Sequence, residues 1–208
     1  MYLPPHFEET DRAEIEGLIA EFPLAAIVGH VGGDLFANHI PLFLQGESRL
    51  IGHVARANDM HRALEPGQAV LAIFRGEESY VSPNWYPSKQ THHRHVPTWN
   101  YQVAHVRGAI RFSHDAKDKR AVVGRLTKMM EERANGAAAW RMADAPADYM
   151  EKMLEEIVAL SIDISGIAAK SKLSQNRERA DHDNVVEELI RRGDAGMAQA
   201  MRKRPSKN

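Results

Sequence analysis

The segment from residue 24 to residue 55 constrains the fold most strongly, because three apolar runs follow one another with only short turns between them. The runs read LAAIVGHV, LFANHIPLFL and RLIGHVA, separated by a Gly-Gly-Asp turn and a Gly-Glu turn. Runs of this length joined by tight turns are typical of an antiparallel meander. Pro41 inside the second run predicts an edge position or a bulge, because proline cannot donate a ladder hydrogen bond.

The rest of the chain adds more strands and several helices. Apolar runs and alternation predict strands at AVLAIFR, at YVS after Gly76-Glu77-Glu78, and at residues 99–112 and 158–164. Helical spacing of apolar residues predicts helices that begin near residues 11, 57, 115, 147 and 176, the first with a capping box of Asp11 and Glu14.

Six or seven strands in meander order, with helices inserted late, predict a mainly β protein with peripheral helices, in the α+β class. We expect a small antiparallel barrel with the helices packed on its outside. Residues 1–175 are expected to form this domain with its inserted helices. Residues 176–208 are expected to form a C-terminal helix, which ends at Gly193, and a basic tail packed on the same domain.

Composition excludes several classes of protein. The chain of 208 residues has no cysteine, which excludes a disulfide scaffold and thiolate chemistry. No apolar run approaches the roughly 18 residues of a membrane span, and the first residues do not resemble a signal peptide, so we expect a cytoplasmic protein without membrane contact. The net charge of -1 disfavours a broad nucleic-acid surface, although the tail from Met201 to Asn208 is basic.

Aromatic residues concentrate between Tyr80 and Tyr101, where 22 residues hold two of the three Trp and three of the five Tyr. Prolines at positions 83, 87 and 97 prevent a continuous helix, so the segment is predicted to be two strand ends joined by an ordered loop with aromatic walls. Two interpretations remain open. The rings form either a small core under a long loop or a site for a flat ligand with polar edges.

A first polar cluster, His53, Arg56 and Asn58, lies where a predicted strand becomes a helix. Free backbone N–H groups and a guanidinium indicate an anion site, and phosphate is the usual ligand of such sites. The alternative is a plain helix cap at Asn58 or Asp59, with Arg56 exposed to solvent.

Two further clusters lie inside the aromatic stretch, around Ser82, Trp85 and Tyr86 and around Thr98, Trp99 and Asn100. Their rings, hydroxyls and amides could bracket a conjugated ring system. His92, His93 and His95 lie close together in the same stretch. The absence of a nearby acidic residue and the unspecific spacing argue against a metal site, and the role of these histidines stays open.

The fourth cluster is the run KSKLSQNR, residues 170–177, which is predicted to follow directly after a strand. Its hydrogen-bond donors would suit a phosphate or the polar edge of a pyrimidine. The alternative interpretation is a solvated turn in which Ser174 or Asn176 caps the last helix.

Six motifs that follow one another along nearly the whole chain resemble the PaiB family of flavin-binding split-barrel proteins: MYLPPHFEETD, ANHIPL, GHVARAN, SYVSPNWYPSK, VPTWNY and KLSQNR. The resemblance implies a six-stranded split barrel, kinship with pyridoxamine-phosphate-oxidase-like flavoproteins, and a homodimer with FMN at the subunit interface. It also implies negative regulation of transcription, through DNA or a protein partner. The alternative function is that of an FMN-dependent oxidoreductase of the same kinship, so enzymatic activity stays open.

The matching motifs contain the candidate FMN-binding residues, and the chemistry of the side chains selects among them. The candidates are His53, Arg56, Asn58, Ser82, Trp85, Tyr86, Lys89, Thr98, Trp99, Asn100, Lys172, Ser174, Gln175, Asn176 and Arg177. No catalytic residue is assigned, and Tyr86, His93 and His95 are the only acid or base candidates worth testing.

Overall fold

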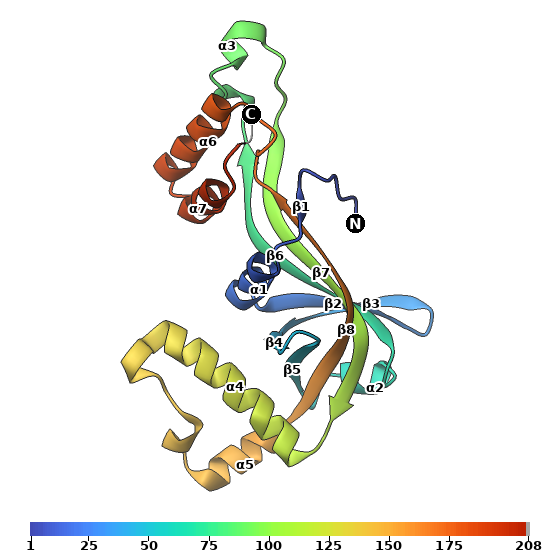
Figure 1. Ribbon diagram of the computed structural model, residues 1–208. Coiled ribbons are helices and arrows are strands. Elements are labelled where there is room, and N and C mark those ends of the chain that lie inside the picture. The colour runs from blue at the N-terminus through green and yellow to red at the C-terminus, as the bar shows by residue number, and fades with distance from the viewer. Residues whose placement is uncertain (207–208) are drawn as a thin grey trace. The chain divides into compact units, whose positions relative to one another are not determined.

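The computed structural model describes residues 1–206 and confirms a mainly antiparallel β protein with helices (Figure 1). The strands are β1 (Glu8–Glu9), β2 (Leu24–Val31), β3 (Asp34–Pro41), β4 (Phe43–Gln45), β5 (Arg49–Ala55), β6 (Ala69–Val81), β7 (Thr98–Ser113) and β8 (Ile157–Lys172). Their order in the sheet is β3-β2-β6-β7-β8-β5-β4, and β1 pairs with β8.

The helices are α1 (Arg12–Glu21), α2 (Met60–Ala63), α3 (Lys89–His92), α4 (Ala116–Asn135), α5 (Ala147–Glu155), α6 (Arg179–Arg191) and α7 (Ala195–Lys203). Among the described residues, none of these helices is both long enough and apolar enough to cross a bilayer. The predicted C-terminal helix proves to be two helices, because Gly193 adopts a φ of 85° and ends the first of them.

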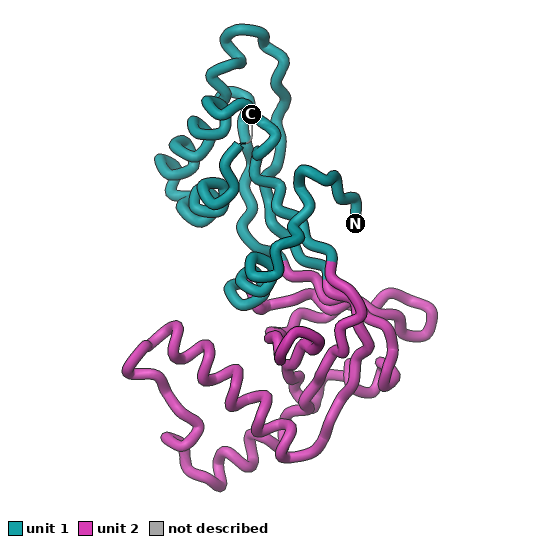
Figure 2. Tube along the Cα trace, viewed as in Figure 1, with its two compact units in different colours: residues 1–21, 75–105, 168–208 teal, residues 22–74, 106–167 magenta. Residues whose placement is uncertain are grey.

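The chain forms two compact units, coloured separately in Figure 2. Unit 1 contains residues 1–21, 75–105 and 168 to the last described residue, and unit 2 contains residues 22–74 and 106–167. Strands β6, β7 and β8 each contribute residues to both units. The expected division at residue 175 stays a prediction.

Unit 2 contains the predicted meander. β2 pairs with β3 along its whole length, and β4 pairs with β5. The second apolar run is broken at Leu42, whose N–H donates to the carbonyl of Pro23 at 2.8 Å. Pro41 therefore ends β3, a strand at one end of the sheet order, as an edge position predicts.

One face of β5 and β8 in unit 2 is covered by α4. Phe43, Ile51, Val122 and Ala159 form an apolar cluster there, and Leu126 packs against it. Asp115 begins the helix, because its side chain accepts hydrogen bonds from the backbone N–H groups of the first turn. The predicted start of a helix near residue 115 is confirmed.

In unit 1, β6 continues through Gly76-Glu77-Glu78, where the sequence predicts an interruption. A Cβ atom at Gly76 would lie 3.1 Å from the Cβ of Gln102 and 3.2 Å from Leu18, so glycine here allows close packing rather than a turn. The α1 helix is capped by Asp11, which accepts from Ala13 at 2.9 Å. The carboxylate that reaches back to the Asp11 N–H belongs to Glu9, not to Glu14.

The core of unit 1 forms between the end of β6 and the two C-terminal helices. Val81, Tyr86 and Leu173 are buried there together with side chains of α6 and α7. These helix residues are Val185, Val186, Leu189, Met197, Ala198, Ala200 and Met201. The apolar spacing in α6 and α7 thus explains why both helices pack against the aromatic stretch.

Candidate functional site

His53 lies on β5 in unit 2, opposite Ala159 of β8. Burial lowers the pKa of His53 below its usual value, which favours the neutral imidazole. Its buried Nδ1 has no hydrogen-bond partner among residues 1–206. Because an unsatisfied buried polar atom costs roughly 1–3 kcal/mol, this nitrogen fits a position that a bound polar group completes.

Arg56 and Asn58 follow directly after β5. Asn58 Oδ1 accepts a hydrogen bond from the Met60 N–H at 3.0 Å, although Asn58 lies one residue before the N-cap Asp59, whose own side chain makes no capping bond. The helix that follows has one turn and adds little electrostatic field. Arg56 is exposed, and its Nη1 donates to the Glu155 carbonyl at 3.5 Å, which leaves most of its donors for a ligand.

In the aromatic stretch of unit 1, some rings belong to a small core, and others are exposed and available to a flat ligand. Tyr86 is 1% exposed and belongs to the core, and its contact with FMN stays a prediction. Tyr80 and Trp99 are 45% and 48% exposed, with ring centroids 6.3 Å apart. Trp85 packs partly against the core, under the guanidinium of Arg192. Tyr80 and Trp99 are therefore the rings available for stacking.

Ser82 and Lys89 are occupied by local contacts. Ser82 Oγ accepts from the Asn84 N–H at 3.2 Å and caps the short 3₁₀ turn Pro83–Trp85. Lys89 Nζ donates to Asn84 Oδ1 at 2.5 Å. Both side chains therefore stabilise the loop after β6 in this structure.

Asn100 and Ser174 bind each other in the interior of unit 1. The Asn100 amide donates to Ser174 Oγ at 3.0 Å, and a second contact of 3.2 Å joins Ser174 Oγ to Asn100 Oδ1. Asn100 is fully buried, and Ser174 has a positive φ of 63°. This pair holds the turn after β8 in a conformation that non-glycine residues rarely adopt.

The two lysines of the fourth cluster, Lys170 and Lys172, lie inside β8 rather than after it. Its remaining residues lie either in the turn that follows β8 or on the surface. Gln175 accepts from the Leu173 N–H at 2.7 Å and donates to the Ser171 carbonyl at 2.6 Å. Asn176 is exposed. The Arg177 guanidinium lies over the Tyr86 ring, 5.0 Å from its centroid.

Lys172, like Lys170 and Arg177 of this cluster, has no acidic partner within the described chain. The Nζ of Lys172 donates to Thr98 Oγ1 and to the carbonyl of Trp99, both neutral oxygens. Burial, and then the positive charges of Lys170 and Arg177, lower the pKa of Lys172. A partly buried ammonium beside two other cations fits the phosphate of a bound nucleotide.

The sequence did not predict the buried network that surrounds Ser88, His95 and Asp181. Ser88 Oγ donates to Asp181 Oδ2 at 2.6 Å, and the Ser88 N–H donates to Asp181 Oδ1 at 3.0 Å. His95 Nε2 lies 2.7 Å from Ser88 Oγ. The only advance signal was an aspartate on the apolar face of α6, one turn before Val185.

Proton positions in this network follow from its neighbours. The guanidinium of Arg177 lies 3.5 Å from His95 Nδ1, so Nδ1 is the acceptor and Nε2 carries the proton. Ser88 Oγ then accepts from His95 and donates its own proton to Asp181. The arrangement locks the loop to α6, and it differs from a catalytic triad, in which the serine proton faces the histidine.

The other two histidines of the loop lie on its surface. The ring centroids of His92 and His95 lie 4.8 Å apart with the ring planes tilted by 47°, and His93 has a positive φ of 55° at the end of α3. Within residues 1–206, no group of three His, Cys, Asp or Glu side chains is arranged to hold a metal ion.

The structure thus brings some candidates together. Thr98, Trp99 and Lys172 meet in unit 1, and Arg177 contributes to the charge around Lys172. His53, Arg56 and Asn58 belong to unit 2. Asn100, Ser174 and Gln175 hold the fold of unit 1 rather than offering free donors.

Comparisons with known proteins give a family and a fold. A family described as "Putative FMN-binding domain" matches residues 1–166. The protein "Protease synthase and sporulation protein PAI 2" of Bacillus subtilis is 33% identical over 195 residues, covering 91% of this chain and 89% of that protein. The family match includes the motifs GHVARAN, WYPSK and VPTWNY and ends before KLSQNR.

Solved structures of flavoproteins share the fold. The FAD and haem binding protein from Mycobacterium smegmatis is similar with a TM-score of 0.61 and 20% identity, over 79% of this chain and 73% of that chain. The flavocytochrome Anf3 from Azotobacter vinelandii is similar with a TM-score of 0.58 and 16% identity, over 79% and 69% of the two chains. The expected split-barrel fold is confirmed, but its sheet has eight strands rather than six or seven and is not closed.

Proposed function

Because this chain belongs to the FMN-binding family that matches residues 1–166, and FMN is its cofactor, we propose that it acts as a negative regulator of transcription. Its similarity to PAI 2 supports this role, since the name of that protein links it to protease synthesis and sporulation. The presence or absence of FMN is the signal in this proposal, and the regulated target is DNA or a protein partner.

Lys172 carries the proposal, because its partly buried ammonium binds only neutral oxygens of the described residues and a phosphate would balance its charge. An ammonium has three N–H donors, and two of them bind Thr98 Oγ1 and the Trp99 carbonyl. The third donor remains for a phosphate oxygen. Lys170 and Arg177 raise the local positive potential.

Lys170 contacts different groups from those that Lys172 contacts. Its Nζ lies 5.5 Å, 5.9 Å and 5.2 Å from the ring centroids of Tyr2, Phe7 and Tyr101, and it donates to the Tyr2 carbonyl. These rings already stabilise its charge. We therefore assign the direct phosphate contact to Lys172 and a supporting field to Lys170.

The ring of FMN would stack near Trp99, whose backbone carbonyl binds Lys172 and whose side chain is half exposed. Bound FMN supplies reversible one- and two-electron redox chemistry. The exposure of Tyr80 and Trp99 favours a second candidate function, an FMN-dependent oxidoreductase, because a second substrate could approach a ring stacked there.

Two assays on FMN-loaded protein separate the two functions. The regulator predicts a sequence-selective gel shift with genomic DNA fragments, or specific capture of a protein partner, that changes when FMN is removed. The oxidoreductase predicts rapid anaerobic bleaching of the flavin absorbance by NADH or NADPH. Bleaching at a useful rate without FMN-dependent DNA or partner binding would contradict the regulator.

The proposal also includes a homodimer and a cytoplasmic location. A dimer would place two FMN sites in one particle, as the resemblance to the PaiB family implies. Light scattering on FMN-loaded protein should give twice the 23.3 kDa chain mass. A monomer that still binds FMN would remove the dimer from the proposal and leave FMN binding intact.

A further inference from the structure

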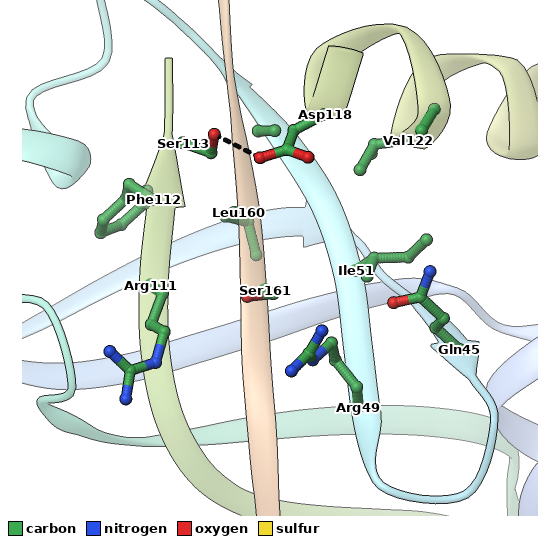
Figure 3. Close-up of a pocket in the computed structure, with 12 residues that line it drawn as sticks. Gln45, Arg49, Ile51, Arg111, Phe112, Ser113, Asp118, Val122, Leu160 and Ser161 are labelled. Carbon is green, nitrogen blue, oxygen red and sulfur yellow. Dashed lines mark hydrogen bonds between the residues drawn. The ribbon is translucent and has the colours of Figure 1, made fainter. Parts of the chain in front are cut away.

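A cavity of about 300 Å³ lies in unit 2, lined by residues of β4, β5, β7, β8 and α4 (Figure 3). None of the residues that line it belongs to the FMN candidates. Its volume lies at the lower end of the range of small-molecule pockets, roughly 300–1,000 Å³. The cavity therefore has room for a ligand much smaller than FMN.

One end of the cavity is positively charged. Arg49 on β5 and Arg111 on β7 both bind Asp163, with Nε to carboxylate distances of 2.8 Å and 3.3 Å. These are the only side-chain partners of the two guanidiniums within residues 1–206, so their terminal N–H groups are free. Two positive charges face one negative charge, and arginine forks suit a planar carboxylate.

The opposite end is negatively charged. Figure 3 shows Ser113 and Asp118 together at the far side of the cavity from the two arginines, joined by a hydrogen bond of 2.6 Å from Ser113 Oγ to Asp118 Oδ2. The second carboxylate oxygen of Asp118 has no partner in the described part of the chain. It would repel an anion and attract an ammonium or a hydroxyl group.

The wall between the two ends is apolar. Ile51, Val122 and Ala159 line the cavity and belong to the apolar cluster under α4. Arg111 and Ser113 lie two residues apart on β7, which separates the two ends by about 7 Å along the strand. A chain of methylene groups fits this distance and this wall.

We propose that the cavity binds a small ω-amino carboxylate, with its carboxylate on Arg49 and Arg111, its methylene chain on Ile51 and Val122, and its ammonium at Asp118. The site shares no residue with the proposed FMN site, so its ligand would be a second small molecule that the protein binds. It does not depend on the regulatory role or on Lys172.

The test is calorimetric titration of FMN-saturated protein with 6-aminohexanoate, and with hexanoate, which lacks the ammonium. We expect saturable binding of 6-aminohexanoate that the double substitution Arg49→Gln, Arg111→Gln weakens by tenfold or more, since each charge-assisted bond contributes strongly. Arg75→Gln is the matched control, because Arg75 is an exposed arginine paired with Glu78 and lies outside the cavity. It should leave binding unchanged.

Two more variants distinguish the ends of the site and guard against misfolding. Asp118→Asn should weaken the binding of 6-aminohexanoate and leave the affinity for hexanoate unchanged or higher. Ala121→Met, on the exposed side of α4, should fill the cavity and abolish binding of both while the helix is kept. Absence of saturable binding, binding that survives the double arginine substitution in folded protein, or loss of FMN in that variant would overturn the proposal.

Discussion

Two polar regions of unit 1 differ in how fully the protein satisfies them. Around Asp181, each carboxylate oxygen accepts a hydrogen bond from Ser88, and His95 completes the network. Around Lys172, the ammonium meets two neutral oxygens, and no carboxylate of the described residues balances its charge. Both regions are dense in polar side chains, but only the region around Lys172 was predicted from the sequence as a candidate site.

The difference separates structural polar groups from groups that a ligand completes. Buried polar atoms are normally hydrogen-bonded, so a fully satisfied network needs no ligand to explain it. A desolvated cation without an anion is unfavourable in the free protein and becomes favourable when an anion binds. Substitutions around Asp181 should therefore lower stability more than FMN affinity. Substitution of Lys172 should lower FMN affinity more than stability.

The largest effect is expected from Asp181→Ala. It leaves the Ser88 N–H and hydroxyl without acceptors in a site where the Asp181 side chain is 1% exposed, so we expect a loss of about 3 kcal/mol in the free energy of unfolding. Urea unfolding measures it. Glu187→Ala on the exposed side of α6 is the control and should change stability by less than about 0.5 kcal/mol. Equal effects of the two substitutions would show that the network does not hold the loop.

A smaller loss is expected from Asn100→Ala. This change removes the buried partner of Ser174 and leaves a small cavity, so unfolding should become easier by about 2 kcal/mol. FMN affinity, measured on folded protein by fluorescence quenching, should fall less than in Lys172→Met. A greater loss of FMN affinity in Asn100→Ala than in Lys172→Met would place Asn100 among the ligand contacts.

The smallest effect concerns the pH dependence of the FMN-free protein. The pKa of Lys172 is lower in the folded than in the unfolded chain, so the unfolded state binds more protons between the two values. Stability relative to Lys172→Met should therefore rise as the pH approaches the unfolded lysine pKa of about 10.4. Urea unfolding of both proteins across this pH window checks the sign. A difference that falls with rising pH would contradict a desolvated Lys172.

The sequence predicted the parts of the fold that depend on local pattern. Alternation and tight turns placed β2, β3 and β5, and the helical spacing of apolar residues placed the start of α4 near residue 115. The continuation of β6 through Gly76 could not be predicted, because the small residue is required by contacts with Leu18 and Gln102, far away in the chain. Local signals cannot distinguish such packing from a turn.

The candidate site was predicted only in outline for the same reason. The motifs located the polar residues, but whether each one faces a ligand depends on partners that lie far away in the sequence. Ser88 and Asp181 are 93 residues apart, and Asn100 and Ser174 are 74 apart. The cavity beside Arg49 and Arg111 was missed because four strands and a helix bring its residues together.

The central claim, that Lys172 is completed by the phosphate of FMN, is tested most directly by comparing FMN with riboflavin, which lacks the phosphate. Fluorescence quenching titrations should show that Lys172→Met weakens FMN by tenfold or more and leaves riboflavin nearly unchanged, since a charge-assisted hydrogen bond contributes about 1.5–3 kcal/mol. Lys89→Met, whose ammonium binds Asn84, is the control and should affect neither ligand. Equal losses of FMN and riboflavin in Lys172→Met, or a phosphate-specific loss in Arg56→Ala alone, would contradict the claim and move the phosphate to unit 2.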